Sequence, residues 1–142
     1  MKDLISFEIR PFEKKDLRQV MALLSLEGYT REDSAIEDCF TCVLTLEDAG
    51  LEDEIIGFFT FEPGLNLKLK HFLVAKEFRN LNHHNCEWGL IKYVKNIARI
   101  NGFGQMIVHG KGRRMIRFLR AYFRTLPYGQ AEDGTCFFLV RV

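Results

Sequence analysis

The middle of the chain carries residue types that could perform acid–base chemistry. His71 lies in a short apolar segment that ends at Val74. A neutral imidazole can take a proton from an amine near neutral pH, directly or through water. A histidine in a strand can also simply face solvent or bond a neighbouring group. We therefore treat His71 as a candidate general base, with a structural role as the alternative.

A polar turn follows this segment and leads into a helix, an order that presents backbone N–H groups to a phosphate. The free N–H groups and the positive end of the helix dipole both favour an anion there. The same side chains could cap the helix, and capping does not exclude anion binding. The residues that we assign to this anion site are Arg79, Asn80, Asn82, His83, His84 and Asn85.

Two further charged segments could bind a partner. The stretch 111–124 contains Lys111, Arg113, Arg114, Arg117, Arg120 and Arg124 and no acidic residue. It could contact the phosphates of a cofactor, a nucleic acid or an acidic protein surface, or it could be a solvated face. The acidic residues within 32–38 could bind an amine or pair with the basic segment of a second copy.

Cysteine usage leaves two interpretations open. Cys39 and Cys42 form a C-x-x-C motif, which can hold a metal or serve in redox chemistry, whereas Cys86 and Cys136 stand alone. Because a second close pair is missing, we take buried, reduced thiols as the default and expect no metal site.

The apolar periodicity predicts the elements that position these residues. Strands are expected over 5–10, 40–46, 55–61, 67–74, 106–108 and 136–140, and helices over 13–26, 85–100 and 113–123. Asn101 and Gly102 end the second helix, Gly110 and Gly112 form a second strand-to-helix turn, and a hairpin closes the chain. Trp88 is expected to anchor the core.

The element order β-α-β-β-β-α-β-α-β predicts an α/β fold with a mixed, mostly antiparallel sheet flanked by helices. The length of 142 residues suits a single domain over 1–142. The net charge of +1 gives no general argument for a nucleic-acid partner. No signal peptide or membrane-length apolar run is evident, so we expect a cytoplasmic protein with no membrane partner.

The element order resembles the GNAT superfamily of acyl-CoA N-acyltransferases. The specific match is to the family segment V-x-P-E-Y-R, which here reads Val74-Ala75-Lys76-Glu77-Phe78-Arg79. In that family a strand splays from its parallel neighbour and the pantetheine arm of the cofactor lies in the gap. The resemblance implies that Phe72 and Val74 offer backbone groups to acetyl-CoA, and that the amides from Arg79 onward hold its pyrophosphate.

The resemblance also implies a reaction, the direct transfer of an acetyl group from acetyl-CoA to a small-molecule or protein amine. His71 is then the candidate base, and the N–H of Val74 is the candidate donor to the oxyanion.

The chain departs from the family pattern at several positions. Asn82 and His84 stand where the family loop has glycine, and Phe118 or Leu119 where a tyrosine often protonates the leaving thiolate. On an ideal helix, Tyr122 was expected to point elsewhere. These differences favour an alternative function as a catalytically eroded structural or assembly protein, without cofactor, that acts through protein partners or self-assembly. A weaker resemblance, of the helix at 115–120 to acetyltransferase-like proteins of short-tailed phages, implies a virion location.

Overall fold

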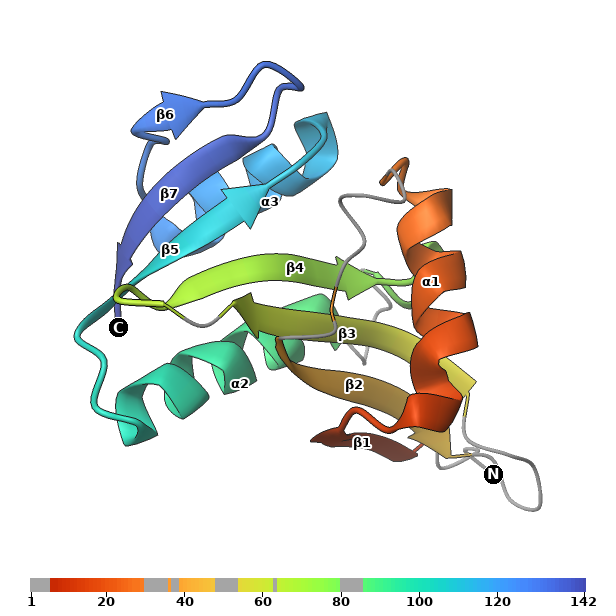
Figure 1. Cartoon of the computed structure of the whole chain (residues 1–142). Helices are drawn as coiled ribbons and strands as arrows, with labels where there is room; N and C mark the ends of the chain where they lie inside the picture. The colour runs from red at the N-terminus through yellow and green to blue at the C-terminus, as the bar shows by residue number, and fades with distance from the viewer. Residues whose placement is uncertain (1–5, 30–35, 37–38, 48–53, 63, 80–85) are drawn as a thin grey trace, which may run out of the picture.

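A seven-stranded mixed sheet forms the centre of the molecule (Figure 1). The computed structural model describes residues 6–29, 36, 39–47, 54–62, 64–79 and 86–142. The strand order is β1-β2-β3-β4-β5-β7-β6, and every pair is antiparallel except β4 with β5. The strands are β1 (Ser6–Pro11), β2 (Phe40–Glu47), β3 (Glu54–Glu62), β4 (Lys68–Val74), β5 (Gln105–Gly110), β6 (Gly129–Gln130) and β7 (Cys136–Arg141).

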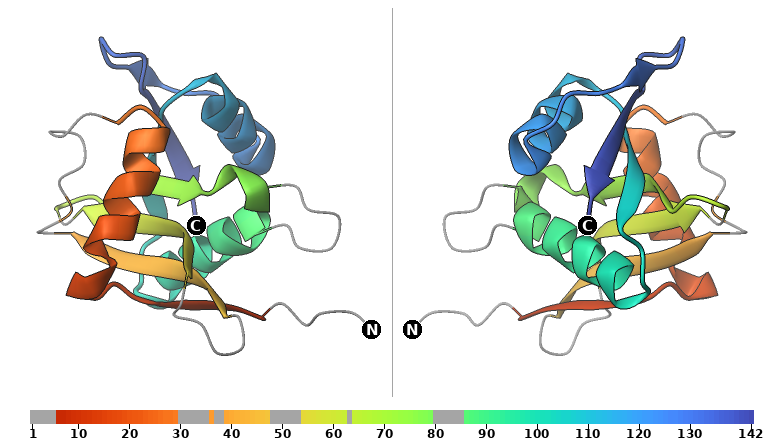
Figure 2. Two further views of the ribbon diagram at one scale, coloured as in Figure 1. Left: turned by 90° about the vertical axis from the view of Figure 1, so that its right-hand side faces the viewer. Right: turned by 90° about the vertical axis from the view of Figure 1, so that its left-hand side faces the viewer.

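Three α-helices cover the two faces of this sheet, as the side views in Figure 2 show. They are α1 (Leu17–Leu26), α2 (Cys86–Ile100) and α3 (Arg113–Phe123). Single turns of 3₁₀ helix precede α1 (η1, Lys14–Asp16) and follow β4 (η2, Lys76–Phe78). The predicted fold class and element order are confirmed, with the short strand β6 as the partner of β7 in the closing hairpin. No helix within the described residues is long and apolar enough to cross a membrane.

Side chains point alternately to the two faces of the sheet along each strand, so each face has its own core. Phe58 and Leu73 point to the α1 side, where they pack with Val20 and Leu24. Their neighbours in the strands, such as Phe59, point to the other side and join the larger cluster under α2 and α3. Because β3 is buried on both faces, its sequence is a mostly apolar run and does not alternate between apolar and polar residues.

The cysteines contribute to this packing. Cys42, Cys86 and Cys136 are buried, and Cys39 is half-buried just before β2. Burial raises the pKa of the Cys42 thiol to about 11, so this thiol stays protonated at neutral pH. Among the described residues no group of three or more His, Cys, Asp or Glu side chains could hold a metal ion.

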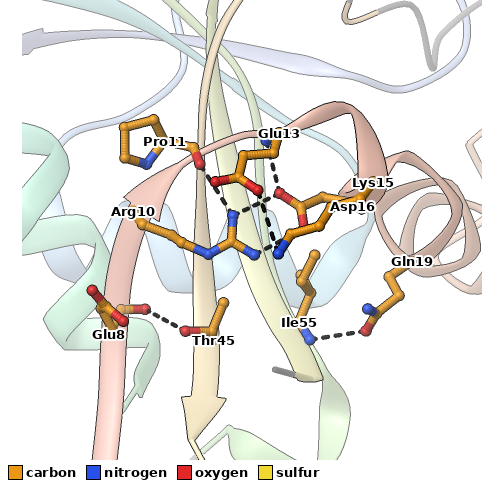
Figure 3. Close-up of polar contacts among 9 residues, drawn as sticks. All are labelled: Glu8, Arg10, Pro11, Glu13, Lys15, Asp16, Gln19, Thr45 and Ile55. Carbon is orange, nitrogen blue, oxygen red and sulfur yellow. Dashed lines mark hydrogen bonds and ion pairs between the residues drawn. The ribbon is translucent and has the colours of Figure 1, made fainter. Parts of the chain in front are cut away.

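A buried ion pair fixes the entry into α1 (Figure 3). The guanidinium of Arg10 in β1 donates two hydrogen bonds to the carboxylate of Asp16, at 2.7 and 2.8 Å. The same carboxylate accepts the backbone N–H of Glu13 at 2.8 Å. Gln19 on α1 then accepts the N–H of Ile55 at 2.9 Å, which joins the helix to β3. These bonds set the position of α1 on its face of the sheet.

A bulge in β4 separates this strand from β5. Thr60 of β3 pairs with His71 and Phe61 with Leu69, so Lys70 is an extra residue in the ladder. Strand β4 pairs with β5 only at Lys68 with Ile107 and at Leu69 with Val108. Beyond Leu69 the two parallel strands diverge (Figure 1).

Gly57 allows β3 to approach the diverging end of β4 closely. It pairs with Val74, and a Cβ at this position would lie 2.8 Å from the carbonyl oxygen of Leu73. Such a contact with backbone cannot be relieved by rotating a side chain. The glycine is therefore required by packing, and it helps to hold the last residues of β4 against β3.

We expect Asp16→Asn to lower the free energy of unfolding by about 3 kcal/mol, because it removes the buried negative charge that the Arg10 guanidinium compensates. Asparagine keeps the size of the side chain and an acceptor for Glu13, so the substitution isolates the charge. Urea denaturation at pH 7 measures the change. Lys15→Gln is the matched control, because Lys15 and Glu13 form an exposed pair at 3.4 Å worth less than about 1 kcal/mol. Equal, small effects of both variants would contradict the role of the buried pair.

Candidate functional site

The diverging end of β4 has a backbone edge that no strand in the described part of the chain covers. Ala75 donates its N–H to Ile56 of β3 at 2.6 Å. Because backbone direction alternates along a strand, Phe72 and Val74 direct their N–H groups to the opposite edge, toward the gap beside β5. The pairing with β5 ends at Leu69, so this edge is outside the ladder. The two residues predicted to offer backbone groups thus lie where the strands separate.

Arg79 closes the turn that follows β4. Its Nε donates to the carbonyl oxygen of Val74 at 2.7 Å, and its guanidinium forms an ion pair with Glu27 just after α1. The side chain is only 10% exposed. Arg79 therefore uses its donors to hold the turn and to join it to the end of α1, and the carbonyl of Val74 is already bonded within the chain.

The rest of the predicted anion site, Asn80, Asn82, His83, His84 and Asn85, lies outside the described residues. Its role stays a prediction. The acidic segment at 32–38 is likewise outside the described residues except for Ile36.

The start of α2 is joined to α3 by a second ion pair. Glu87, in the first turn of α2, is 2% exposed. Its carboxylate accepts two hydrogen bonds from Arg114 of α3, at 3.1 and 2.8 Å. Arg114 compensates the negative charge of Glu87 at a helix end that is otherwise suited to an anion. The pair also fixes the two helices relative to each other beside the gap.

Aromatic side chains occupy the space between α2 and α3. Phe118 stacks on Phe72 with ring centroids 6.1 Å apart, and Trp88 contacts Tyr122 at 4.7 Å. Tyr122 and Phe118 are themselves stacked at 6.1 Å. The expectation that Tyr122 points elsewhere was wrong, because residues four apart share a helix face. Trp88 is 45% exposed, so it covers the margin of this cluster rather than anchoring the core.

On the α1 side of the sheet, a cavity of about 140 Å³ lies over the point of divergence. His71 of β4 and His109 of β5 both line it. The remaining lining residues come from the end of α1, the bulge, the turn after β5 and the β6–β7 hairpin; they are Tyr29, Lys70, Lys111, Asp133 and Thr135. The cavity thus collects titratable groups from segments that are distant in the sequence.

His71 is a buried histidine with a defined partner, at 1% exposure. Its Nδ1 lies 2.9 Å from the hydroxyl oxygen of Thr60, which also accepts the backbone N–H of His71 at 3.1 Å. The tautomer decides its chemistry. If Nδ1–H donates to Thr60, Nε2 is unprotonated and can accept a proton; if Thr60 donates to Nδ1, Nε2 carries the proton. Of the two structural alternatives for His71, the solvent-facing one is wrong and the partnered one is confirmed.

Sequence inspection missed His109. Burial lowers the pKa of its imidazole, and the nearby Lys68 and Lys70 lower it further, whereas Glu62 raises it. His109 therefore presents a neutral imidazole to the cavity at neutral pH. The available signal was its place near the end of a strand that runs parallel to β4, because the carboxyl ends of neighbouring parallel strands meet at one edge.

Lys111 belongs to the basic segment at 111–124, and the structure places it on the cavity. Its Nζ lies 4.8 Å from the ring centroid of Tyr29 and 4.0 Å from the carboxylate of Asp133. These contacts link the turn after β5 to the end of α1 and to the last hairpin. The cavity wall is thereby closed by a cation–π contact and an ion pair.

Solved structures show where this architecture occurs. An acetyltransferase of the GNAT family from Staphylococcus aureus Mu50 matches with a TM-score of 0.72 and 14% identity, over 96% of this chain and 99% of that one. The PaiA N-acetyltransferase from Thermoplasma acidophilum, in complex with coenzyme A, matches with a TM-score of 0.65 and 12% identity, over 96% and 99%. The ribosomal-protein-S18-alanine N-acetyltransferase from Escherichia coli matches with a TM-score of 0.66 and 10% identity, over 96% and 94%.

The chain therefore has the GNAT fold over nearly its whole length, as the sequence predicted. No family model matches the sequence, and no curated protein matches it. At these identities the likeness establishes the fold, and function has to be argued from the site.

We expect the lowered pKa of His109 to make the protein less stable in mild acid. Below the ordinary pKa of 6.5 the unfolded chain takes up a proton that the folded chain resists, so stability falls until the pH passes the lower folded pKa. Above that ordinary pKa both the folded and the unfolded chain hold a neutral imidazole, so His109 adds no pH dependence to the stability. Urea denaturation between pH 7.5 and 4.5 should show a shallower decline for His109→Gln than for the wild type. An unchanged pH profile would contradict this, and Lys92→Gln on exposed α2 surface is the control.

Proposed function

We propose that the protein is an N-acyltransferase that moves an acetyl group from acetyl-CoA to a primary amine by direct transfer. The observation that carries the proposal is the uncovered edge of β4 with His71 at the same point of the sheet. The edge faces the gap between the parallel strands, and His71 lines a cavity on the α1 face. One site for the acyl donor and one for the acceptor would meet at the divergence of β4 from β5.

The described residues suit the cofactor in part. The N–H groups of Phe72 and Val74 have the direction that a pantetheine arm requires, and the start of α2 suits a pyrophosphate. The carbonyl of Val74 is less suited, because Arg79 already bonds it. A protein with the same fold has been solved in complex with coenzyme A, which supports a coenzyme A thioester as the cofactor. When bound, the cofactor would supply an acetyl thioester, which is activated toward amines.

Residues of this chain would perform the remaining tasks. His71, in the tautomer that carries its proton on Nδ1, would accept the proton of the amine at Nε2. Thr60 would hold that tautomer by accepting the Nδ1–H. The N–H of Val74 would donate to the developing oxyanion. Burial raises the pKa of Tyr122, so its hydroxyl is protonated at neutral pH and could donate to the departing sulfur. Phe118, which stands where the family often has tyrosine, carries no hydroxyl and cannot do so.

A second candidate function is a structural or assembly role that retains the fold without catalysis. The observation that favours it is Arg79, which is kept from the family motif. Here it bonds Val74 and pairs with Glu27, so its donors serve the chain itself. A GNAT fold stabilised in this way would need no cofactor.

Acetyl-CoA titration by calorimetry separates the two functions. We expect micromolar affinity, because backbone donors and a helix N-terminus act together, and at least tenfold weaker binding for Arg79→Gln. Glu27→Gln is the matched control, since it breaks the same ion pair but leaves the guanidinium in place. Equal weakening in both variants would mean that Arg79 acts only through the fold. No heat of binding at millimolar acetyl-CoA would exclude the enzyme and favour the structural role.

The assignment of the base is tested by turnover. Thiol release from acetyl-CoA should be measured with a panel of polyamines, amino acids and lysine peptides. We expect His71→Gln to lower kcat/KM by about 10²-fold or more while the affinity for acetyl-CoA is kept. His109→Gln, on the other side of the cavity, should cost less. The reverse ranking would transfer the role of base to His109.

A further inference from the structure

The basic segment at 111–124 divides into three groups with different surroundings. Lys111 lines the cavity and Arg114 pairs with Glu87. The other four cations remain on one exposed face of α3 and the residue that follows it; they are Arg113, Arg117, Arg120 and Arg124. This third group, which we call the arginine row, belongs neither to the proposed acetyl-transfer site nor to the core.

The arginine row lines a groove of about 940 Å³. Helix α3 forms one wall, the segment at Thr125 and Leu126 continues it, and Asp133 and Gly134 of the β6–β7 hairpin form the other. Helical periodicity places the row on the side of α3 away from Arg114, Phe118 and Tyr122, which face α2. The groove is therefore separate from the gap where the cofactor would lie.

The arrangement of the row suits a chain of phosphates. Its members occur at spacings of four, three and four residues, so they form one line about 16 Å long at 1.5 Å per residue. Among the described residues, no hydrogen bond or ion pair engages any of these four guanidinium groups. The acid among the described lining residues, Asp133, pairs with Lys111. The groove is thus strongly cationic although the whole chain has a net charge of only +1.

We propose that this groove binds the phosphodiester backbone of a single-stranded nucleic acid. A row of guanidinium groups can form paired hydrogen bonds to successive phosphates. A single concave channel with one line of cations fits one strand rather than the two backbones of a duplex. The described residues that line the groove include no aromatic side chain, so we expect contacts to phosphate and sugar with little sequence preference.

An acidic protein segment fits the same groove less well. Protein interfaces obtain most of their affinity from buried aromatic or large apolar anchors. The apolar lining here consists of Ile116, Ala121 and the exposed Leu126, with no pocket-filling partner among them. Binding through charge alone is typical of nucleic-acid backbones, where counterion release supplies the free energy.

Fluorescence anisotropy with labelled 20-nucleotide RNA and DNA strands tests the proposal on the intact chain. We expect binding at 50 mM salt that weakens about 50-fold by 200 mM, since four neutralised phosphates give a log–log slope near −3 for single strands. Arg117→Gln/Arg120→Gln should weaken binding at least tenfold and reduce the slope by about half. Lys92→Gln/Arg99→Gln, which removes two exposed charges from α2, is the matched control and should change little.

Further measurements distinguish a nucleic-acid strand from other ligands of the groove. A preference for RNA or for DNA identifies the natural strand and supports the proposal. Absence of binding at 50 mM salt, or equal loss in the row and control variants with normal thermal melts, overturns it. Equal binding of a polyglutamate 20-mer would assign the groove to an acidic protein. Displacement of the strand by 1 mM coenzyme A would assign it to the cofactor, and failure to bind acetyl-CoA elsewhere leaves this test unaffected.

Discussion

One extra residue in β4 determines the architecture of the candidate site. Lys70 is an extra residue in the pairing of β4 with β3, and at the bulge that it forms β4 leaves β5 after two paired residues. Backbone groups that would otherwise complete a parallel ladder then face a gap. Phe72 and Val74 of β4 and Met106 and Val108 of β5 all pack in the larger core under α2 and α3, so packing on this face supports the separated strands. Gly57 contributes to the same constraint, because it lets β3 lie directly against the last residues of β4.

The two faces of the sheet provide different chemistry at this opening. On the face of α2 and α3, the ion pair of the buried Glu87 with Arg114 and an aromatic cluster set the walls of the gap. On the face of α1, two histidines and several charged side chains line a small cavity. Arg79 links β4 to the end of α1, since it bonds the backbone of β4 and pairs with Glu27, the residue after α1. A donor and an acceptor could thus approach one strand from opposite faces, which is the physical basis of the transferase proposal.

The accuracy of prediction differed between local patterns and contacts. The helix at 113–123 was predicted with its observed bounds, and the strands at 55–61 and 67–74 within one residue at each end, because apolar periodicity and glycine turns are local properties. Tyr122 was misplaced through a simple error of helix geometry. Trp88 was expected inside, yet it lies at the margin, since its burial depends on how far α3 extends over α2. His109 was not predicted, because its one signal is the parallel pairing of its strand with β4, a contact between segments distant in the sequence.

By itself the sequence determined the order of the elements, the fold class and the position of the turn after Val74, because each follows from the types and spacing of nearby residues. It also placed His71 in the correct strand. Only the tertiary structure decided that His71 is buried against Thr60, that His109 shares its cavity, and that the basic segment separates into a cavity lysine, a helix clamp and the arginine row. These outcomes depend on strand register, on the bulge at Lys70 and on the packing of helices across the sheet. Such long-range contacts are set by the whole fold, so no local pattern contains them.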